Sequence, residues 1–256
     1  MASNDFDKIS LAYDSSIDWE GRLRREIPFI VEAVGGVRGK RILDLACGTG
    51  RHGIALSGLG ADVVGVDSSE EMVSRARQMA EEDDAAVEFM MADMADIKDT
   101  VSGLFDMVIC LGNSLALLPS QDTVQRVIAD VHHLLAPGGV FLFQILNFEE
   151  ILSSGFRYVP AKAGRTVDGT EMVFFRFFTH DKENQVSTLV LSAFEKREQE
   201  WQVMMSSIEV LQLNSKIVND MMPICGFSEI RTYGSYDGET FDSQENRNLV
   251  VVALND

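Results

Sequence analysis

A glycine-rich turn between two acidic residues is the first feature of this chain that could do chemistry. The segment Asp44-Leu45-Ala46-Cys47-Gly48-Thr49-Gly50 follows a short apolar run, and Asp67 follows the next apolar run. Glycines at such a turn let the backbone approach a ligand closely. A carboxylate at the end of the second strand can accept hydrogen bonds from both ribose hydroxyls of a nucleoside. The pattern therefore predicts a nucleoside site, against a plain strand-turn-helix in which Asp67 only caps a helix.

A dinucleotide site is the alternative use of this turn. The segment Gly48-Thr49-Gly50-Arg51-His52-Gly53 matches G-x-G-x-x-G, and Asp67 lies 19 residues after its first glycine. Three features count against a dinucleotide. Asp44 stands ahead of the glycines, where dinucleotide sites carry a glycine or an apolar residue. Asp93 follows the third strand, where it could accept from an adenine amino group, and the polar turn Gly112-Asn113-Ser114 follows the fourth.

Repeated strand–helix units must position these residues. Apolar runs predict strands at 41–46, 61–66, 87–91, 105–111 and 140–145, and apolar periodicity predicts helices at 17–34, 52–59, 70–82 and 122–135. The segment Ala136-Pro137-Gly138-Gly139 is predicted to separate the last helix from the strand after it. Because the strands are almost continuously apolar, we expect a parallel sheet covered by helices on both faces, that is, an α/β fold.

The pattern changes after Leu152. Longer strands are predicted at 172–180, 185–196 and 201–213, then a helix at 214–225 and two closing strands at 228–233 and 248–253. We therefore expect residues 1–152 and 214–256 to form a ligand-binding α/β core, and residues 153–213 to form an antiparallel β cap around the substrate. Candidate wall residues of this cap are Tyr158, Phe174, Phe175, Arg176 and Trp201.

Composition and charge limit the partners of the chain. It has 256 residues, 46% of them apolar and 24% charged, with a formal net charge of −18. That charge repels phosphate backbones and anionic lipid, so we expect neither a nucleic-acid nor a membrane partner. No apolar run reaches the roughly 18 residues of a membrane span, and residues 1–10 lack a signal-peptide core, which predicts a cytoplasmic protein. Cys47, Cys110 and Cys225 lie far apart, so neither a disulfide framework nor a metal site is predicted.

Five segments in order resemble the motifs of the class I methyltransferases. They are residues 42–50 (ILDLACGTG), 63–72 (VVGVDSSEEM), 92–94, 105–111 and 134–140 (LLAPGGV). The resemblance implies a doubly wound, seven-stranded, mostly parallel Rossmann-like sheet and an S-adenosylmethionine-dependent methyltransferase that acts on a small molecule. It also implies a set of donor-binding residues in these segments: Asp44, Ala46, Gly48, Asp67, Ser68, Met72, Asp93, Met94 and Leu111.

Three further segments are similar to the glycine and sarcosine N-methyltransferases. They are residues 16–22 (SIDWEGR), 108–114 (VICLGNS) and 147–152 (NFEEIL). By this similarity Arg22 would bind the carboxylate of the methionine part of the donor, and Tyr13 would lie beside the methyl group. Asn113 and Asn147 would belong to the acceptor site.

One residue departs from that subfamily. Its members carry an arginine for the acceptor's carboxylate immediately before the third segment, and this chain has Leu146 there. Loss of a guanidinium removes the bidentate partner that a carboxylate needs in a closed pocket. The departure argues against glycine as the acceptor, unless Arg157 or Arg176 takes this role.

The implied reaction sets modest demands on acid–base chemistry. A sulfonium donor is already activated, so the enzyme mainly aligns donor and acceptor, and an amine acceptor needs less help from a base than a hydroxyl or a carbon acid. His52 is predicted as an exposed helix residue and His180 as a turn residue, so no catalytic base is predicted. An amine is the favoured acceptor. Two other functions stay open: an NAD-dependent oxidoreductase, and a catalytically silent protein that binds adenosyl ligands.

Overall fold

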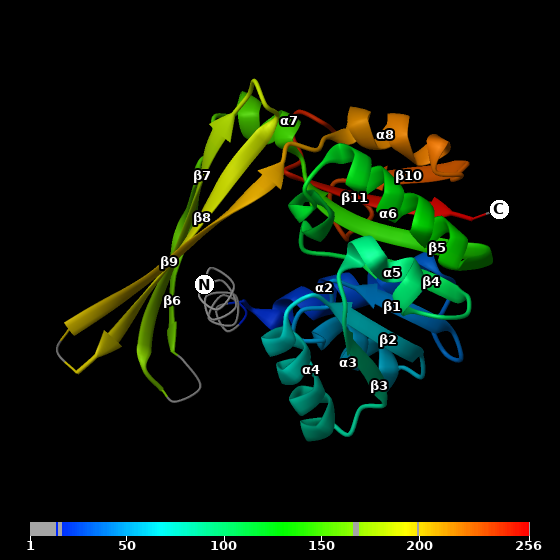
Figure 1. The fold of residues 1–256 in the computed structure, drawn as a ribbon, viewed down its shortest axis with the longest axis horizontal. Helices are drawn as coiled ribbons and strands as arrows, with labels where there is room; N and C mark the ends of the chain where they lie inside the picture. The colour runs from blue at the N-terminus through cyan, green and yellow to red at the C-terminus, as the bar shows by residue number, and fades with distance from the viewer. Residues whose placement is uncertain (1–13, 15–16, 166–168, 199, 256) are drawn as a thin grey trace.

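A seven-stranded sheet forms the larger part of the fold (Figure 1). The computed structural model describes residues 14, 17–165, 169–198 and 200–255. The strands of this sheet are β1 (Arg41–Leu45), β2 (Asp62–Asp67), β3 (Val87–Met91), β4 (Phe105–Cys110), β5 (Leu135–Leu146), β10 (Glu229–Tyr233) and β11 (Asn248–Leu254). Their order is β10-β11-β5-β4-β1-β2-β3. Strand β11 pairs antiparallel with β10 and with β5, and the other neighbouring strands pair parallel. The predicted α/β class with a seven-stranded, mostly parallel sheet is confirmed.

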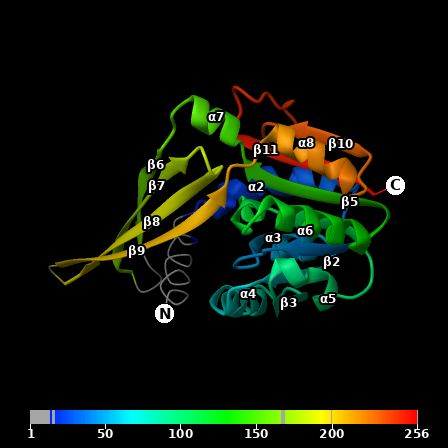
Figure 2. The ribbon, with the colours of Figure 1, turned by 45° about the horizontal axis from the view of Figure 1, so that its top comes forward.

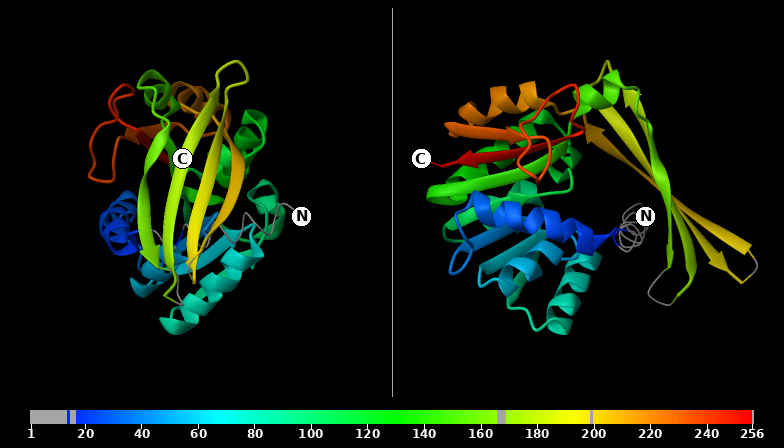
Figure 3. Two further views of the ribbon diagram at one scale, coloured as in Figure 1. Left: turned by 90° about the vertical axis from the view of Figure 1, so that its left-hand side faces the viewer. Right: turned by 180° about the vertical axis from the view of Figure 1, so that it is seen from behind.

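Helices cover both faces of this sheet. They are α2 (Trp19–Ala33), α3 (Arg51–Gly58), α4 (Glu70–Glu82), the 3₁₀ helix η1 (Met94–Asp96), α5 (Ile97–Thr100), the 3₁₀ helix η2 (Ser114–Leu117), α6 (Gln121–Leu134), α7 (Phe148–Ser153) and α8 (Ser215–Ile224). Helices α2, α3 and α4 pack on one face and α5, α6 and α8 on the other; Figure 3 shows α2 in front of the sheet in its right-hand view. Within the described ranges, no helix combines the length and the apolarity that crossing a membrane requires.

Side-chain caps explain where several helices begin. Asp18 precedes α2 and accepts from the backbone N–H of Gly21 at 3.0 Å. Ser69 and Ser120 do the same for the first turns of α4 and α6. These caps satisfy N–H groups that have no partner within the helix. The helix starts predicted from the sequence at residues 17, 52, 70 and 122 lie within two residues of the observed starts of α2, α3, α4 and α6.

A second, antiparallel sheet stands beside the first one (Figures 1 and 2). Its strands are β6 (Tyr158–Arg165), β7 (Glu171–Asp181), β8 (Val186–Arg197) and β9 (Glu200–Leu211), hydrogen-bonded in chain order. The sequence predicted three of these strands and missed β6. Most residues of β6 are exposed, so this edge strand lacks the apolar alternation by which a strand is recognised.

The connection between α6 and β5 is another difference from the prediction. The proline–glycine segment 136–139 does not separate the two elements, because strand pairing begins at Leu135, opposite Phe105. Pairing then shifts, and Met107 lies opposite Val140. The side chain of Asn255 donates to the carbonyls of Leu135 and Ala136 at 2.9 and 3.1 Å. The segment is therefore a bulge inside β5, held by the carboxyl-terminal residues.

Candidate active site

The main cavity lies at the point of the large sheet where the order of the strands reverses, next to β1. Strands β2 and β3 extend from one side of β1, and β4 and β5 from the other. In open α/β sheets the crevice at the carboxyl ends of such strands is the usual ligand site. A cavity of about 1360 Å³ occupies this position. It extends from the glycine turn after β1 to the face of the second sheet, so it has room for two ligands side by side.

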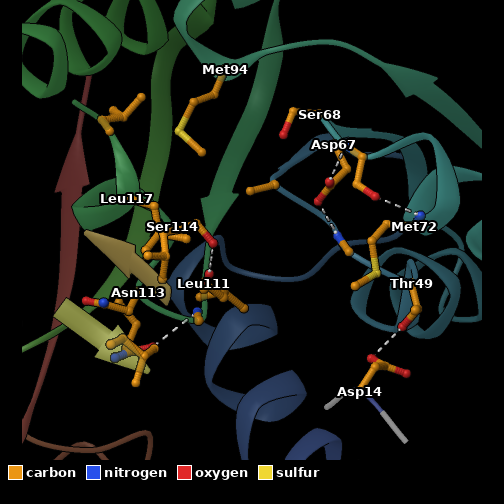
Figure 4. Close-up of a pocket in the computed structure, with 18 of the residues that line it drawn as sticks. Asp14, Thr49, Asp67, Ser68, Met72, Met94, Leu111, Asn113, Ser114 and Leu117 are labelled. Atoms are coloured by element: carbon orange, nitrogen blue, oxygen red, sulfur yellow. Dashed lines mark hydrogen bonds between the residues drawn. The ribbon is translucent and has the colours of Figure 1, made fainter. Parts of the chain in front are cut away.

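The glycine turn and Asp67 form one unit at the edge of this cavity. Asp67 Oδ2 accepts from the backbone N–H of Gly48 at 2.8 Å, and Oδ1 accepts from that of Ser69 at 3.0 Å (Figure 4). The turn needs left-handed backbone at Ala46 and at Gly48, with φ of 59° and 56°. Ser68 and Met72 line the cavity next to it. Asp67 therefore both fixes the turn and faces the ligand space.

Asp44 lies beneath the same turn, almost completely buried. Its Oδ2 atom has no hydrogen-bond partner among the described residues. Burial raises the pKa of this carboxyl from 3.8 to about 6, and the neighbouring charge of Asp67 adds to this effect. The charge of His52, the backbone N–H of Gly53 and Arg22 act in the opposite direction. The cavity therefore contains a buried carboxyl group with one oxygen that has no hydrogen-bond partner in the described part of the chain.

A buried charge cluster links α2 to the helix after the glycine turn. His52 Nε2 lies 2.5 Å from Glu26 Oε2, and Arg22 Nε donates to Glu26 Oε1 at 2.8 Å. Burial raises the pKa of Glu26, but the hydrogen bond from His52 and the charge of Arg22 outweigh it and leave the pKa below the usual value. The expectation that His52 is exposed is wrong, since only 5% of the residue is accessible. All three residues line the cavity.

The turns after β3 and β4 supply the remaining residues of this half of the cavity. Asp93 caps η1 by accepting from Ala95 N–H at 2.9 Å. Met94, the next residue, also lines the cavity and is labelled in Figure 4. Leu111 and Asn113 line the cavity after β4. Asn113 has a φ of 69°, and its Oδ1 accepts from the backbone N–H of Leu146 at 2.8 Å. Its side chain thus ties the turn after β4 to the end of β5.

One predicted site residue, Asn147, is absent from the cavity lining, and another lies outside the described residues. Asn147 is fully buried and lies outside the lining. Its Nδ2 donates to the carbonyls of Ser243 and Asn246, both at 2.8 Å, and its Oδ1 accepts from Glu149 N–H. These bonds use its amide to hold the segment before β11, away from the cavity lining. Tyr13 lies outside the described residues.

The second sheet closes the other half of the cavity with one face. Arg176 and Phe178 of β7, Leu189 and Leu191 of β8, and Ile208 of β9 line it. Of the five wall residues considered from the sequence, only Arg176 lies there. Tyr158 and Trp201 are 63% and 47% exposed, Phe174 packs in a separate cluster, and Phe175 lies on the opposite face of β7. His180 bonds to Ser187 and to the carbonyl of Phe156, so it is a half-buried strand residue.

Charge is unevenly distributed along the cavity. Its described acidic lining residues all come from the first 93 positions of the chain and surround the glycine turn: Asp14, Glu26, Asp44, Asp67, Glu70, Glu71 and Asp93. The half beside the second sheet carries Arg126, Arg176 and Arg247 in a mostly apolar wall. Arg247 bonds to Glu150 through Nε at 3.1 Å and Nη2 at 3.2 Å. The two halves therefore suit ligands of different charge.

Sequence reasoning missed several cavity residues. Gln144 of β5 accepts from Gly112 N–H at 3.1 Å and donates to Asn248 at 3.2 Å, inside the cavity. Tyr236 and Arg247 reach the cavity from the segment between β10 and β11. None of them belongs to a segment whose spacing indicates a site. Tyr236 and Arg247 reach the carboxyl ends of β4 and β5 only through the folded position of the carboxyl-terminal strands.

Comparison with known proteins places this cavity in context. Residues 42–139 match the family model described as a methyltransferase domain. The glycine/sarcosine N-methyltransferase of Aphanothece halophytica is 27% identical over 95% of this chain and 87% of its own length. The glycine/sarcosine N-methyltransferase of Halorhodospira halochloris is 27% identical over 88% of this chain and 79% of its own length.

Solved structures show the same fold. An S-adenosylmethionine-dependent methyltransferase from Clostridium acetobutylicum ATCC 824 has a TM-score of 0.79 at 17% identity, over 97% of this chain and 98% of its own. A sugar N-methyltransferase from Streptoalloteichus sp ATCC 53650 has a TM-score of 0.74 at 19% identity, over 95% of this chain and 91% of its own.

Proposed function

We propose that this chain, which belongs to the class I S-adenosylmethionine-dependent methyltransferases, transfers the methyl group to a small-molecule amine. The observation that carries the proposal is the single cavity with two halves. One half is the acidic glycine-turn region and the other is the apolar face of the second sheet. A methyl transfer between two bound molecules requires such adjacent compartments, because donor and acceptor must meet in line.

The residues of the first half fit an adenosyl donor. Asp67 lies at the carboxyl end of β2, where a carboxylate accepts from ribose hydroxyls. Backbone at Gly48 faces open space, since a Cβ built there meets no atom within 4 Å. The partnerless Oδ2 of Asp44 offers an acceptor for the amino-acid end of the donor. Asp93, Met94, Met72, Ser68 and Leu111 would surround the adenosine, and Arg22 would meet the carboxylate.

The bound donor supplies a methyl group already activated on a sulfonium. The protein's task is then to orient the donor and the acceptor toward each other and to exclude water from them. The acidic residues around the glycine turn favour a cationic ligand electrostatically. The second sheet presents Phe178, Leu191 and Ile208 to the acceptor, and these apolar side chains shield it from water. Asn113 lines the cavity in the turn after β4, where it would contact the acceptor.

The acceptor half suggests a molecule larger than glycine. Leu146 lines it where the related enzymes carry an arginine, and most of the wall around Leu146 is apolar. Arg157 does not line the cavity and donates to the carbonyl of Phe178. Arg176 does line it. We therefore propose an amine with an apolar body, and assign any acidic group on it to Arg176.

A dinucleotide fits this cavity poorly. Its pyrophosphate would lie against the glycine turn, close to Asp44, Asp67 and the other acidic lining residues. The buried carboxylate of Asp44 would then face two phosphate charges of the same sign, which is costly in a poorly solvated site. An NAD-dependent oxidoreductase is therefore not favoured.

The test is turnover with methyl-labelled S-adenosylmethionine and a panel of acceptors: glycine, sarcosine, simple amines, aryl-alkyl amines, amino sugars and phenols. Labelled product from amines with an apolar body is expected. Glycine turnover would refute the argument from Leu146. Donor binding without any product would support a silent binding protein instead, and absence of donor binding would refute the whole proposal.

A further inference from the structure

Two tyrosines of the carboxyl-terminal region pack on the same helix, but they differ in whether they line the cavity. The rings of Tyr233 and Tyr236 lie edge to face on Phe29 of α2, with centroid distances of 5.1 and 5.7 Å. Tyr236 lines the cavity, whereas Tyr233 does not. The segment between β10 and β11 therefore delivers one tyrosine, Tyr236, into the site from the far end of the chain.

The hydroxyl of Tyr236 is buried and has no hydrogen-bond partner among the described residues. Buried hydroxyls are almost always paired, because leaving one unpaired sacrifices its hydrogen bonds to water. Burial, with the negative charge of Glu26 next in importance, holds the pKa of this phenol well above its usual value. The phenol is therefore neutral and carries an O–H that can donate. A polar ligand in the cavity would satisfy it.

The surroundings of this hydroxyl indicate which ligand. Glu26 and Arg22 of α2 both act on it electrostatically, and both line the cavity. One carboxylate oxygen of Glu26 already accepts a hydrogen bond from Arg22, and the other is hydrogen-bonded to His52. A Cβ built on Gly112 would lie 3.9 Å from Arg22 Nη2, so this guanidinium reaches the turn after β4. Tyr236 and Arg22 therefore line the same cavity and act on each other electrostatically, and the Arg22 guanidinium lies beside the turn after β4.

We propose that Tyr236 recognises the amino-acid end of S-adenosylmethionine, its hydroxyl donating to the donor's carboxylate beside Arg22. The inference rests on the proposed function of this cavity. A neutral donor next to a guanidinium gives the carboxylate a second, differently directed hydrogen bond. Two such bonds fix the amino-acid chain and with it the sulfonium from which the methyl group leaves. Tyr236 is in this sense a positioning residue for the transfer.

The test compares Tyr236→Phe with Tyr233→Phe, a matched control on the same helix contact. Both variants keep the ring on Phe29 and lose only a hydroxyl. Calorimetry measures affinity for S-adenosylhomocysteine, which has the amino-acid end, and for 5′-methylthioadenosine, which lacks it. Tyr236→Phe is expected to weaken the binding of S-adenosylhomocysteine about tenfold. Its affinity for 5′-methylthioadenosine is expected to stay within about twofold of that of the wild type. Tyr233→Phe is expected to change neither affinity.

The other outcomes separate this inference from the proposed function. Wild-type protein that binds no S-adenosylhomocysteine overturns both. Binding that Tyr236→Phe leaves unchanged overturns the inference alone. An equal loss for both ligands also overturns it, because the hydroxyl would then support the cavity in general. A change confined to the KM of the methyl acceptor would assign the hydroxyl to the acceptor and overturn the inference in the same way.

Discussion

Nε2 of His52 lies 2.5 Å from Oε2 of Glu26, and the two side chains are only 6% and 8% exposed. Glu26 sits on α2 and His52 on α3, so this pair fastens the amino-terminal helix to the helix that follows the glycine turn. Arg22 binds the other oxygen of Glu26. The position of Arg22 in the cavity therefore depends on a buried carboxylate that itself needs both partners.

Glu26→Gln should destabilise the protein by about 3–5 kcal/mol at neutral pH, because it removes the buried negative charge that pairs with Arg22 and is hydrogen-bonded to His52. Glu20→Gln is the matched control: Glu20 pairs with Arg24 on the same helix, but their side chains are 85% and 72% exposed. Such surface pairs contribute about 0–1 kcal/mol. Urea unfolding measures both variants, and equal effects would contradict the assignment.

The same pair predicts a pH dependence. The pKa of Glu26 in the folded protein lies below its usual value. Its contribution to stability is therefore present above the ordinary pKa of a glutamate and is lost as the pH falls through the lower, folded-state value. The gap in unfolding free energy between wild type and Glu26→Gln should narrow below pH 4.5. A gap that stays constant into acid would argue against ionised Glu26.

Gly50→Ala should destabilise the fold by about 2–4 kcal/mol, from overpacking and left-handed backbone strain. Gly50 has a φ of 75°, and a Cβ there would lie 2.4 Å from Cζ of Phe89 and 2.9 Å from Cβ of Ala76. Gly58→Ala is the control, since Gly58 ends α3 with no atom within 4 Å of such a Cβ. It should leave stability unchanged or raise it by up to about 1 kcal/mol. Thermal unfolding distinguishes the two.

Most of the large sheet was predictable because its strands are buried on both sides. β1, β2 and β4 read as continuous apolar runs. Residues at the carboxyl ends of parallel strands, such as Asp67 at the end of β2 and Asp93 after β3, must lie at one edge of the sheet. Both residues line the cavity, and their binding of a donor stays a prediction. Their position is a consequence of topology, which a single sequence can indicate.

The rest depended on packing between distant elements. The run Phe174–Phe178 reads FFRFF, so it carries no alternation from which to choose the inward face. The Glu26–His52 pair joins two helices, and a charged residue on a helix reads as exposed until its partner is known. Asn147 belongs to a segment that resembled an acceptor motif, yet its amide is used to hold the backbone before β11.

Asp67→Asn should weaken binding of S-adenosylhomocysteine by about 10–100-fold, because ribose hydroxyls would lose a charged acceptor. Asp62→Asn at the opposite end of β2 is the control, with a side chain 72% exposed. Asp67 also holds Gly48 and Ser69, so circular dichroism and unfolding must show that the variant is folded. A folded variant with wild-type affinity would refute the ribose assignment.

Arg176→Gln should leave affinity for S-adenosylhomocysteine unchanged, because Arg176 lies on β7 in the acceptor half. For an acceptor with an acidic group it should raise KM about tenfold or more, since the charge-assisted contact is lost. For the corresponding amide or ester the effect should be small. Arg165→Gln, on the exposed strand β6, is the control. An equal change in KM for acidic and neutral acceptors would exclude Arg176 as the partner of the acidic group.

Asp44→Asn should change how stability depends on pH. The pKa of Asp44 rises from 3.8 to about 6 on folding. Between these values the unfolded chain has lost the proton that the folded protein keeps, so the stability of the wild type falls as the pH rises from about 3.8 to about 6 and stays lower above it. At about 1.4 kcal/mol per pKa unit, the variant should gain up to about 3 kcal/mol relative to wild type between pH 4 and pH 7. The control is Asp62→Asn, and a flat difference for Asp44→Asn would contradict the raised pKa.

The same carboxylate should link donor binding to proton release. If Asp44 meets the positively charged amino-acid end of the donor, the bound ligand stabilises its ionised form and lowers its pKa. Binding of S-adenosylhomocysteine at pH 6 should then release a fraction of a proton, which calorimetry detects as a dependence of the binding enthalpy on buffer ionisation. His52, Asp67 and Arg22 also act on Asp44, so the decisive comparison is Asp44→Asn. Proton release that persists in this variant would come from another group and would remove Asp44 from the donor site.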